Sequence, residues 1–575
     1  MTRTIWARTA SAAAILALAV PALHAGTFTN FESGHVRPLA MSPAGEWLFA
    51  VNTPDNRLTI YSAGAASLSF AADVPVGLEP VAVATRVNGA GRVEAWVVNH
   101  LSDSVSIVEV DPLDVTDSHV TRTLLVGDEP RDIVFAGAAG NRAFITAAHR
   151  GQNRPGDPQL TTEGVGRADV WTFDANSLGA ALGGTPLAVV PLFGDTPRGL
   201  AKTADGSTVY AAVFHSGNRT TPLLEPVVSA NGGLPPPPQG STPGNPPTGL
   251  IVKFDGTQWV DEINRDWSPS VPLSLPDQDV FLLDANANPP ALLPSNNSVS
   301  GVGTILFNMV VRPTTGKLFV SNTEARNDIR FEPILRGHIA ESQITVVTGT
   351  SPAAVHLNPH INFNATPGPA SEIAQSVAFP TDMVFSANGA TLYTAALGSG
   401  VVAAFDASLL EAGVVSKTLI PVGDGPSGLA LDAANDRLYV MNRIGHSVSV
   451  VSQLSSPTQR GETARVALRY DPSPAPARNG RRFLYDAKLT SGHGDGACAS
   501  CHIFGDFDSL AWDLGDPFGI VEANPNPFVN AQVGNAFHPM KGPMTTQSLR
   551  GMDGAGPMHW RGDRTGASNP GGSAL

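Results

Sequence analysis

A short phrase recurs along this chain and limits its fold more than any other feature. Close copies are VGLEPVAVA (76–84), VGDEPRDIV (126–134), FGDTPRGLA (193–201) and VGDGPSGLA (422–430), and looser ones are GHVRPLAMS (34–42) and AFPTDMVFS (378–386). An apolar second phrase follows, as in EWLFAVN (46–52), VEAWVVN (93–99), NRAFITA (141–147), STVYAAV (207–213), KLFVSN (317–322), ATLYTAA (390–396) and DRLYVMN (436–442). Seven such units between about residues 35 and 451 indicate a repeat architecture.

The composition of the units favours short strands joined by turns. β-branched and aromatic residues alternate in the second phrases, 58 glycines supply turns, and only 15% of residues are charged, which disfavours long charged helices. Repeated multi-stranded units joined in this way predict a mainly-β, seven-bladed β-propeller over residues 27–452. A β-sandwich and an open solenoid are the alternatives.

Three other regions lack this pattern. Pro/Gly-rich insertions are predicted near 149–169 and 219–300, and the stretches 149–169 and 225–249 have no strand pattern. Flexible spacers, which the composition favours, and recognition segments are the two interpretations. A polar, Pro-rich linker is predicted over 453–478, and the periodicity changes over 479–575.

The N-terminus has the pattern of an export signal. Arg3 and Arg8 precede an apolar run from Ala12 to Val20, and a cut after Ala25 follows a small residue, which predicts a signal peptide over 1–25. The alternative is a membrane anchor, but the run is shorter than the roughly 20 residues of a span. We therefore expect a periplasmic or otherwise exported protein that does not span a membrane. The net charge of −14 excludes nucleic acid as a partner.

The two cysteines of the chain, Cys498 and Cys501, lie in CASCH and are followed directly by His502. C-x-x-C-H is the attachment signature of a c-type haem. It predicts one covalent haem c, with thioether bonds from both cysteines and His502 as the proximal iron ligand. A disulfide would close a tiny loop, zinc would need a further ligand pair, and a thioredoxin-like pair would need a βαβ context.

The ligand on the other face of the iron is left open by the sequence. Residues 536–566 concentrate several candidates, namely His538, Met540, Met544, Met552, Met558 and His559. A methionine or histidine ligand predicts electron transfer, whereas an open face allows peroxide to bind. Met540 and His559 are the leading ligand candidates, with core packing as the alternative for any methionine. Glu522 and His538 are candidate bases near bound peroxide.

The repeats resemble those of the YVTN family of seven-bladed propellers over roughly residues 34–452, and DRLYVMN matches that family's repeat closely. The resemblance implies the fold and says little about activity, because propellers host unrelated functions.

The C-terminal part resembles the di-haem cytochrome c peroxidase and MauG superfamily through GRRFLYDAKLTS, CASCH, TTQSLRG and HWRGDR. The resemblance implies a small, incomplete α-helical cytochrome c-like domain over 479–575. It further implies a peroxidase-like oxidoreductase in which Trp560, with Arg561 and Arg564 beside it, relays electrons, and an ordinary buried tryptophan is the alternative. Two departures weaken it. The chain has no second C-x-x-C-H, and the sequence stops soon after HWRGDR. We expect either a truncated di-haem protein, which we favour, or a single-haem variant.

A cluster of acidic residues follows the haem motif, namely Asp506, Asp508, Asp513 and Asp516. Such oxygens are calcium ligands, and the resemblance to peroxidases that hold calcium adds to this reading. The spacing, however, lacks the acidic loop pattern and its closing glutamate. Solvated loop carboxylates are the favoured interpretation, and calcium is the weaker one.

Together these features predict an exported c-type haem protein in electron transfer, with cytochrome c peroxidase-like activity left open. The propeller would be a docking scaffold for a redox partner protein, or the protein would act on a small oxidant. The acidic surface predicts salt-dependent docking of a basic partner. The alternative is a propeller interaction protein whose haem is structural or vestigial. Catalysis in the propeller channel, near Arg131 and Arg198, ranks last.

Overall fold

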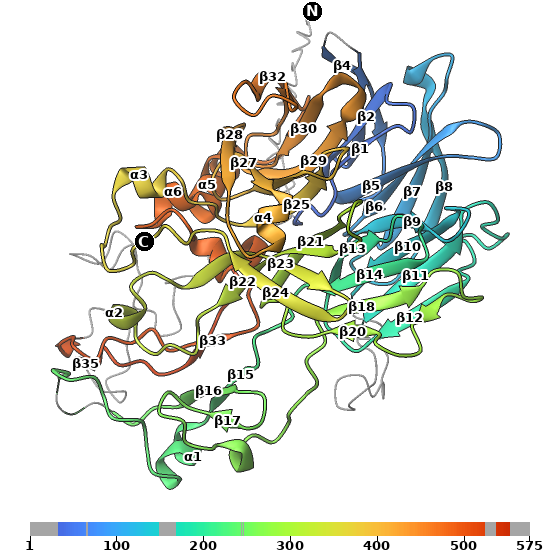
Figure 1. Ribbon diagram of the computed structural model, residues 1–575. Coiled ribbons are helices and arrows are strands. Elements are labelled where there is room, and N and C mark those ends of the chain that lie inside the picture. Colours follow the sequence, from blue (N-terminus) through green and yellow to red (C-terminus); the bar gives the residue numbers. More distant parts are fainter. Residues whose placement is uncertain are drawn as a thin grey trace, which may run out of the picture. The chain divides into compact units, whose positions relative to one another are not determined.

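Seven antiparallel sheets follow one another along the chain, as Figure 1 shows for the computed structural model. The structure describes residues 33–64, 67–148, 168–242, 244, 246–523 and 536–552. The first three blades are β1 (Leu39–Met41), β2 (Trp47–Asn52), β3 (Arg57–Ala63) and β4 (Leu68–Pro75); β5 (Pro80–Val87), β6 (Val93–Asn99), β7 (Ser104–Glu109) and β8 (His119–Leu125); and β9 (Ile133–Ala136), β10 (Arg142–Ala147), β11 (Ala168–Asp174) and β12 (Ala188–Leu192).

The fourth blade carries a fifth strand, and the last three have four strands each. The strands of these blades are β13 (Pro197–Lys202), β14 (Thr208–Val213), β18 (Val280–Asp284), β19 (Ala291–Leu292) and β20 (Ser298–Val299); β21 (Ile305–Val311), β22 (Leu318–Ala325), β23 (Ala340–Thr348) and β24 (Ser351–His356); β25 (Pro380–Phe385), β26 (Thr391–Ala396), β27 (Val401–Asp406) and β28 (Lys417–Pro421); and β29 (Pro426–Asp432), β30 (Arg437–Asn442), β31 (Ser447–Ser452) and β32 (Gly461–Ala467). Short helices α2 (Glu332–Leu335), α3 (Ala370–Ile373) and α4 (Ala407–Glu411) lie between strands.

The first strand of each blade contacts the first strand of the next blade. The series runs β1, β5, β9, β13, β21, β25 and β29, and β29 contacts β1 again. Apolar clusters fill the space between neighbouring blades, and one of them joins Leu48 and Tyr61 of the first blade to Tyr439 and Met441 of the last. This is the arrangement of a β-propeller, which leaves no long unpaired sheet edge. The prediction of a mainly-β chain of repeated sheets is confirmed.

The apolar second phrases are the second strands of the blades. β30, with the sequence RLYVMN, has five buried residues in succession because neighbouring blades cover both of its faces. The outermost strand β8, with the sequence HVTRTLL, instead alternates between exposed and partly covered residues, since its blade edge faces solvent. Position within the blade therefore decides whether a strand reads as a continuous or an alternating apolar run.

The glycine that opens the repeated phrase pairs with the asparagine that ends the second phrase. A Cβ atom on Gly77 would lie 2.6 Å from the side chain of Asn99, so only glycine fits. The buried Asn99 amide donates to Ser104 and Ser106 on the next strand. Asn442 makes the same bonds in the last blade, which explains why glycine and asparagine recur together.

Arg37 links blades across the channel at the centre of the sheets. Its Nη2 atom donates to Asp132 at 3.2 Å, to the carbonyl of Leu200 at 2.9 Å and to Asn308 at 3.1 Å. Its Nη1 atom lies 3.9 Å from Asp382. Both carboxylates are buried, and each also accepts backbone N–H groups from neighbouring strands. One guanidinium thus holds together the inner strands of four blades besides its own.

His35 makes the first and last blades sensitive to acid. Its ring nitrogens bond to the hydroxyls of Ser427 at 2.9 Å and Thr53 at 2.7 Å. Burial, together with the nearby Arg443 and Arg198, lowers the pKa of His35 well below its ordinary value. A lowered pKa gives stability that is present above about pH 6.5 and is lost as the pH falls towards the folded-state pKa.

We expect this histidine to contribute a loss of about 1.4 kcal/mol in unfolding free energy for each pH unit below about 6.5. Urea unfolding at pH 7, 6 and 5 checks the loss, because His35→Gln removes the titrating ring and should flatten the curve. The exposed His119→Gln is the matched control. Identical pH slopes in wild type and His35→Gln would contradict this role.

Part of the predicted insertion over 219–300 belongs to the propeller itself, and strands flank the stretch 225–249 that lacks a strand pattern. The insertion holds a small sheet of β15 (Thr220–Leu223), β16 (Leu250–Phe254) and β17 (Trp259–Val260), the helix α1 (Glu225–Ala230), and three strands of the fourth blade, β18 to β20. Insertion of the small sheet between β14 and β18 separates paired strands in sequence and hides the unit. The insertion expected near 149–169 lies almost wholly outside the described residues.

The predicted linker over 453–478 also differs, since it contains β32 and the start of a helix. β32, with the sequence GETARVA, is the outermost strand of the last blade, and its largely exposed positions lack an apolar pattern. The propeller therefore ends at Ala467. The signal peptide expected over 1–25 lies outside the described residues. None of the helices in the described part of the chain is long and apolar enough to cross a membrane.

The C-terminal part does not show a helical cytochrome domain in its described residues. It contains α5 (Ala475–Tyr485), α6 (Ala487–Thr490), two 3₁₀ turns (Cys498–Ser500 and Ile503–Gly505), and two short strand pairs. The pairs are β33 (Ala511–Trp512) with β36 (Met544–Thr545), and β34 (Glu522–Ala523) with β35 (Ala536–Phe537). This segment packs on propeller loops; Asn327, for example, donates to the carbonyl of Ala511.

Candidate functional site

The Cys–x–x–Cys–His segment forms one tight turn. The N–H of His502 donates to the carbonyl of Cys498 at 3.0 Å, and the N–H of Ser500 donates to that of Ala497 at 2.8 Å. The Ser500 hydroxyl accepts the N–H of Ala497 and closes the start of the turn. These bonds hold both cysteines and His502 within a single turn of the chain.

Both thiols are free. Cys498 is exposed and Cys501 is half-buried. Cys501 packs against an apolar group that includes Leu335, Leu510 and Trp512. Burial raises the pKa of the Cys501 thiol well above its ordinary value, and Asp508 adds to the rise. The two cysteines therefore differ in environment, one open to solvent and one held against a partly apolar wall.

The His502 ring is oriented by a backbone carbonyl. Its Nδ1 atom lies 2.8 Å from the carbonyl oxygen of Gln547. A carbonyl only accepts, so Nδ1 carries a proton, and in the neutral ring Nε2 then holds the lone pair. Nε2 has no hydrogen-bond partner among the residues that the structure describes. Metal-bound histidines commonly donate their second ring nitrogen to a carbonyl in this way. The residues present therefore fit an axial histidine.

Phe504 anchors this turn on the propeller. Its ring stacks on Phe214 with centroids 5.9 Å apart and meets the edge of Phe307 at 6.2 Å. The guanidinium of the buried Arg198 lies 4.7 Å from the centroids of both Phe504 and Phe214. Gly34 leaves room for this ring, because a Cβ atom there would lie 2.6 Å from it.

A common apolar cluster continues this anchoring. It joins residues of blades four to six to residues on either side of the cysteines, namely Phe214, Ile305, Phe307, Ala378, Phe379, Leu397, Ala487, Ala497, Ala499 and Ile503. Burial of this kind contributes about 25 cal/mol for each Å² of apolar surface removed from water. The Cys–x–x–Cys–His turn is thus packed against the propeller.

The acidic residues after the motif stabilise their own loop. Asp508 accepts from the N–H of Leu510 at 2.9 Å and from the indole of Trp512 at 2.8 Å. Asp513 lies 3.5 Å from Arg330, and Asp516 accepts the N–H of Phe518 at 2.8 Å. Within the described residues no group of three or more His, Cys, Asp or Glu side chains is arranged to hold a metal ion. Calcium binding stays a prediction.

Only some of the residues predicted as the second iron ligand lie among the described residues. Met540 is buried, and its N–H donates to the ring of His538 at 3.1 Å. His559 and Trp560 lie outside the described residues, and so do Met558 and both arginines beside Trp560. The structure places Glu522 in β34.

Arg131 and Arg198, which the sequence offers as candidate channel residues, serve packing and hydrogen bonding. The Nε atom of Arg198 donates to the carbonyl of Phe307 at 3.0 Å, and its Nη2 atom donates to that of His35. Burial and the neighbouring Arg131 lower the pKa of Arg198 well below its ordinary value. Arg131 pairs with Glu129 at 3.1 Å. The bonds of Arg198 match the simpler interpretation, in which an arginine satisfies strand-end carbonyls, and Arg131 is held by a carboxylate.

Solved structures share this architecture. The chain is similar to a hydrazine synthase chain of Kuenenia stuttgartiensis, with 17% sequence identity, a TM-score of 0.50, and coverage of 76% of this chain and 99% of that one. The similarity is one of fold. The Cps50 (Swd1) β-propeller domain of Myceliophteria thermophila has 9% identity and a TM-score of 0.40, over 73% of this chain and 97% of that one. No family model and no curated protein matches the chain.

Sequence reasoning missed Phe504 and Gln547. The apolar pair Ile503–Phe504, placed directly after the motif, was the available signal for the anchor, because exposed turns rarely carry two large apolar residues in succession. No sequence signal marks Gln547, since it contributes a backbone carbonyl that any residue provides.

Proposed function

We propose that this chain is an exported c-type haem protein in which Cys498 and Cys501 attach one haem and His502 ligates its iron. The observation that carries the proposal is the orientation of His502, whose Nδ1–H is held by the carbonyl of Gln547. The two free thiols beside it support the same assignment. When bound, the haem supplies a one-electron redox centre. Export agrees with the N-terminal sequence pattern.

The residues around the motif have defined tasks in this proposal. The Gln547 carbonyl keeps the proton on Nδ1, so that Nε2 presents its lone pair to a metal. Phe504 fixes the turn against Phe214 and Arg198 and limits its motion. Electron transfer to a partner protein docked on the propeller is the favoured role. Peroxidase-like chemistry would further require an open distal face of the iron.

A second function has one specific observation in its favour. Ile503 and Phe504 are built into an apolar cluster with residues of three blades. A haem attached beside them would extend that packing, as expected if the haem stabilises a propeller interaction protein. In that case we expect a six-coordinate haem that does not respond to peroxide.

The test is expression of the full chain in a host that matures c-type haem outside the cytoplasm. We expect the intact mass to rise by one haem. Cys498→Ser with Cys501→Ser should abolish the covalent haem, whereas Lys488→Gln on α6 should leave it unchanged. A chain without covalent haem, under conditions in which a known c-type cytochrome matures, would contradict the proposal.

Absorption spectra of the haem-loaded protein separate the two functions. A low-spin spectrum, together with reversible oxidation and reduction, supports electron transfer. A high-spin spectrum that changes on addition of peroxide supports the peroxidase-like variant. A low-spin haem whose loss lowers the melting temperature, and which does not exchange electrons with soluble redox dyes, supports the structural role.

A further inference from the structure

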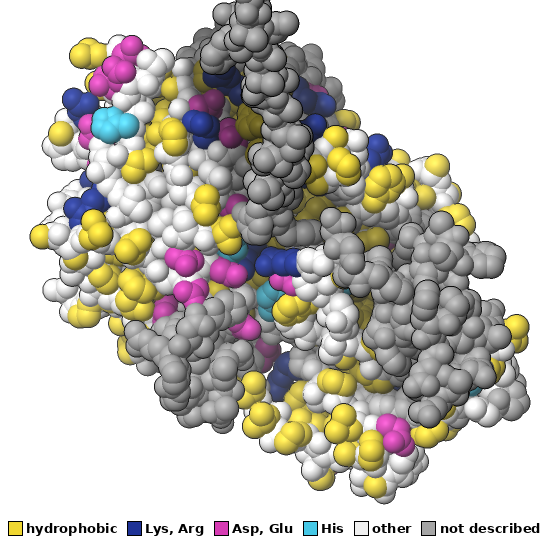
Figure 2. Space-filling view, turned by 180° about the vertical axis from the view of Figure 1, so that it is seen from behind, with side chains coloured by type: hydrophobic (Ala, Val, Ile, Leu, Met, Phe, Trp, Pro, Cys, Tyr) yellow, Lys and Arg dark blue, Asp and Glu magenta, His cyan; other side chains and the backbone are white. Residues whose placement is uncertain are grey.

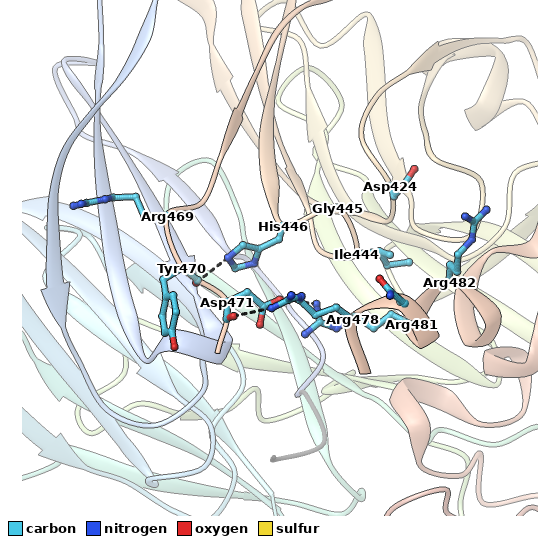
Figure 3. Close-up of a pocket in the computed structure, with 11 residues that line it drawn as sticks. Asp424, Ile444, Gly445, His446, Arg469, Tyr470, Asp471, Arg478, Arg481 and Arg482 are labelled. Carbon is cyan, nitrogen blue, oxygen red and sulfur yellow. Dashed lines mark hydrogen bonds and ion pairs between the residues drawn. The ribbon is translucent and has the colours of Figure 1, made fainter. Parts of the chain in front are cut away.

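A cavity of about 600 Å³ lies away from the cysteines, between the last blade and the helix α5. Its walls come from the turn between β28 and β29, from the turn between β30 and β31, from the segment that follows β32, and from the middle of α5, as Figure 3 shows. These segments lie in the seventh blade or directly before or after it in the chain, and the cavity forms where α5 returns over the end of that blade.

The cavity is rich in positive charge. Four arginines line it, namely Arg469, Arg478, Arg481 and Arg482, against the two aspartates Asp424 and Asp471. The whole chain has 36 Lys and Arg residues against 50 Asp and Glu residues, so such a cluster runs against its overall charge. Figure 2 shows Lys and Arg side chains at several places on one face, with Asp and Glu side chains between them.

Two of the four arginines are already committed to partners. Arg481 pairs with Asp471 at 2.9 Å, and both side chains are nearly buried. Arg469 lies 3.7 Å from Asp73 and 4.5 Å over the ring of Phe70. Its side chain extends away from the other arginines in Figure 3. These two residues shape the walls and leave little charge for a ligand.

The other two arginines have no carboxylate partner within the described part of the chain. Nη1 of Arg478 donates to the backbone carbonyls of Asp471 and Ser473, at 3.1 and 2.9 Å, and its remaining N–H groups are open to the cavity's solvent. Arg482 is exposed and has no side-chain hydrogen bond to the described residues. Each guanidinium can therefore still offer N–H donors to an oxyanion.

In Figure 3 the guanidinium of Arg478 points towards Asp471 and that of Arg482 points away from it, so the two exposed side chains would turn towards each other to hold one anion. Arg478 and Arg482 are four residues apart, so they share one face of the helix. Like charges at this spacing destabilise a helix by a few tenths of a kcal/mol unless something neutralises them. An anion that binds both would remove that repulsion. The guanidinium fork matches carboxylate and phosphate oxygens in two-point contacts.

We propose that this cavity binds a small anion with two or more carboxylate or phosphate groups, held by Arg478 and Arg482. The binding site is separate from the haem motif, and it does not depend on haem attachment. The volume admits a small organic acid or phosphate, and the acidic surroundings of the protein make an acidic macromolecule a poor occupant.

Isothermal titration calorimetry on the full chain at low ionic strength tests the proposal, with citrate and pyrophosphate as the two probes. We expect at least one of them to bind with one-to-one stoichiometry, and acetate to bind at least tenfold more weakly. Comparison of citrate with pyrophosphate separates carboxylate from phosphate chemistry. Arg482→Gln should weaken binding of the preferred probe at least tenfold, and Arg478→Gln should do the same.

Arg336→Gln is the matched control, because Arg336 is an exposed arginine that bonds to Asn364 outside this cavity. Thermal unfolding verifies that each variant is folded, and Arg482→Gln keeps the test valid if Arg478→Gln disturbs α5. Absence of binding for both probes would overturn the proposal. So would equal losses in Arg482→Gln and Arg336→Gln, since these would indicate general charge attraction.

Discussion

Replacement of Arg37 by methionine should lower the free energy of unfolding by about 3–5 kcal/mol, because it leaves buried carboxylates without their cation. Arg37 bonds to Asp132 and lies beside Asp382 at the channel. Methionine has similar length and no charge, so the change removes the ion pairs without opening a large cavity. Urea unfolding monitored by tryptophan fluorescence measures the loss.

The pH dependence of this loss identifies its cause. Burial raises the pKa of Asp382 to about 6, and the nearby Arg37 opposes that rise. Without the arginine the pKa of Asp382 should rise further, so protonation at pH 5 relieves the buried charge. The loss caused by Arg37→Met should therefore be larger at pH 8 than at pH 5.

Arg57→Met is the control for this variant, because Arg57 pairs with Asp55 at 3.1 Å near the surface of the same blade. Exposed pairs of this kind contribute about 0–1 kcal/mol. If both substitutions had the same small effect at both pH values, the channel network would contribute little to stability.

Phe504→Ala should detach the cysteine turn from the propeller. The substitution removes a ring that contacts Phe214, Phe307 and the buried Arg198. We expect the free energy of unfolding to fall by about 3 kcal/mol. This is the lower end of the range for phenylalanine truncation, because the ring is only half-buried. Hydrogen exchange over residues 498–506 should accelerate, while exchange in the outer blades stays unchanged.

Two further variants sharpen this result. Phe507→Ala is the control, since Phe507 is 41% exposed and lies three residues from the anchor. Gly34→Ala tests the same contact from the opposite side, because its Cβ atom would meet the Phe504 ring at 2.6 Å. Exchange rates in Phe504→Ala that match those of Phe507→Ala would show that the turn does not depend on the ring.

Part of this architecture was predictable from local sequence. The repeated phrases predict the strands because each unit carries its own turn, its apolar strand and the glycine that accommodates an asparagine, as Gly77 does for Asn99. The Cys–x–x–Cys–His motif is recognisable from the sequence because two thiols and an imidazole at fixed spacing define it, and haem attachment there stays a prediction. The strand β32 was not predictable, because the exposed positions of an outermost strand give the same sequence pattern as a loop.

The sequence by itself determined the repeat, the turns and the chemical identity of the Cys–x–x–Cys–His motif, because each depends on residues close together in the chain. Only the tertiary structure decided where that motif lies and what surrounds it. Phe504 meets Phe214 and Arg198, and His502 meets Gln547, through contacts between distant segments. The arginine cavity likewise exists only where α5 returns to the last blade. Such contacts depend on long-range packing, which no local pattern encodes.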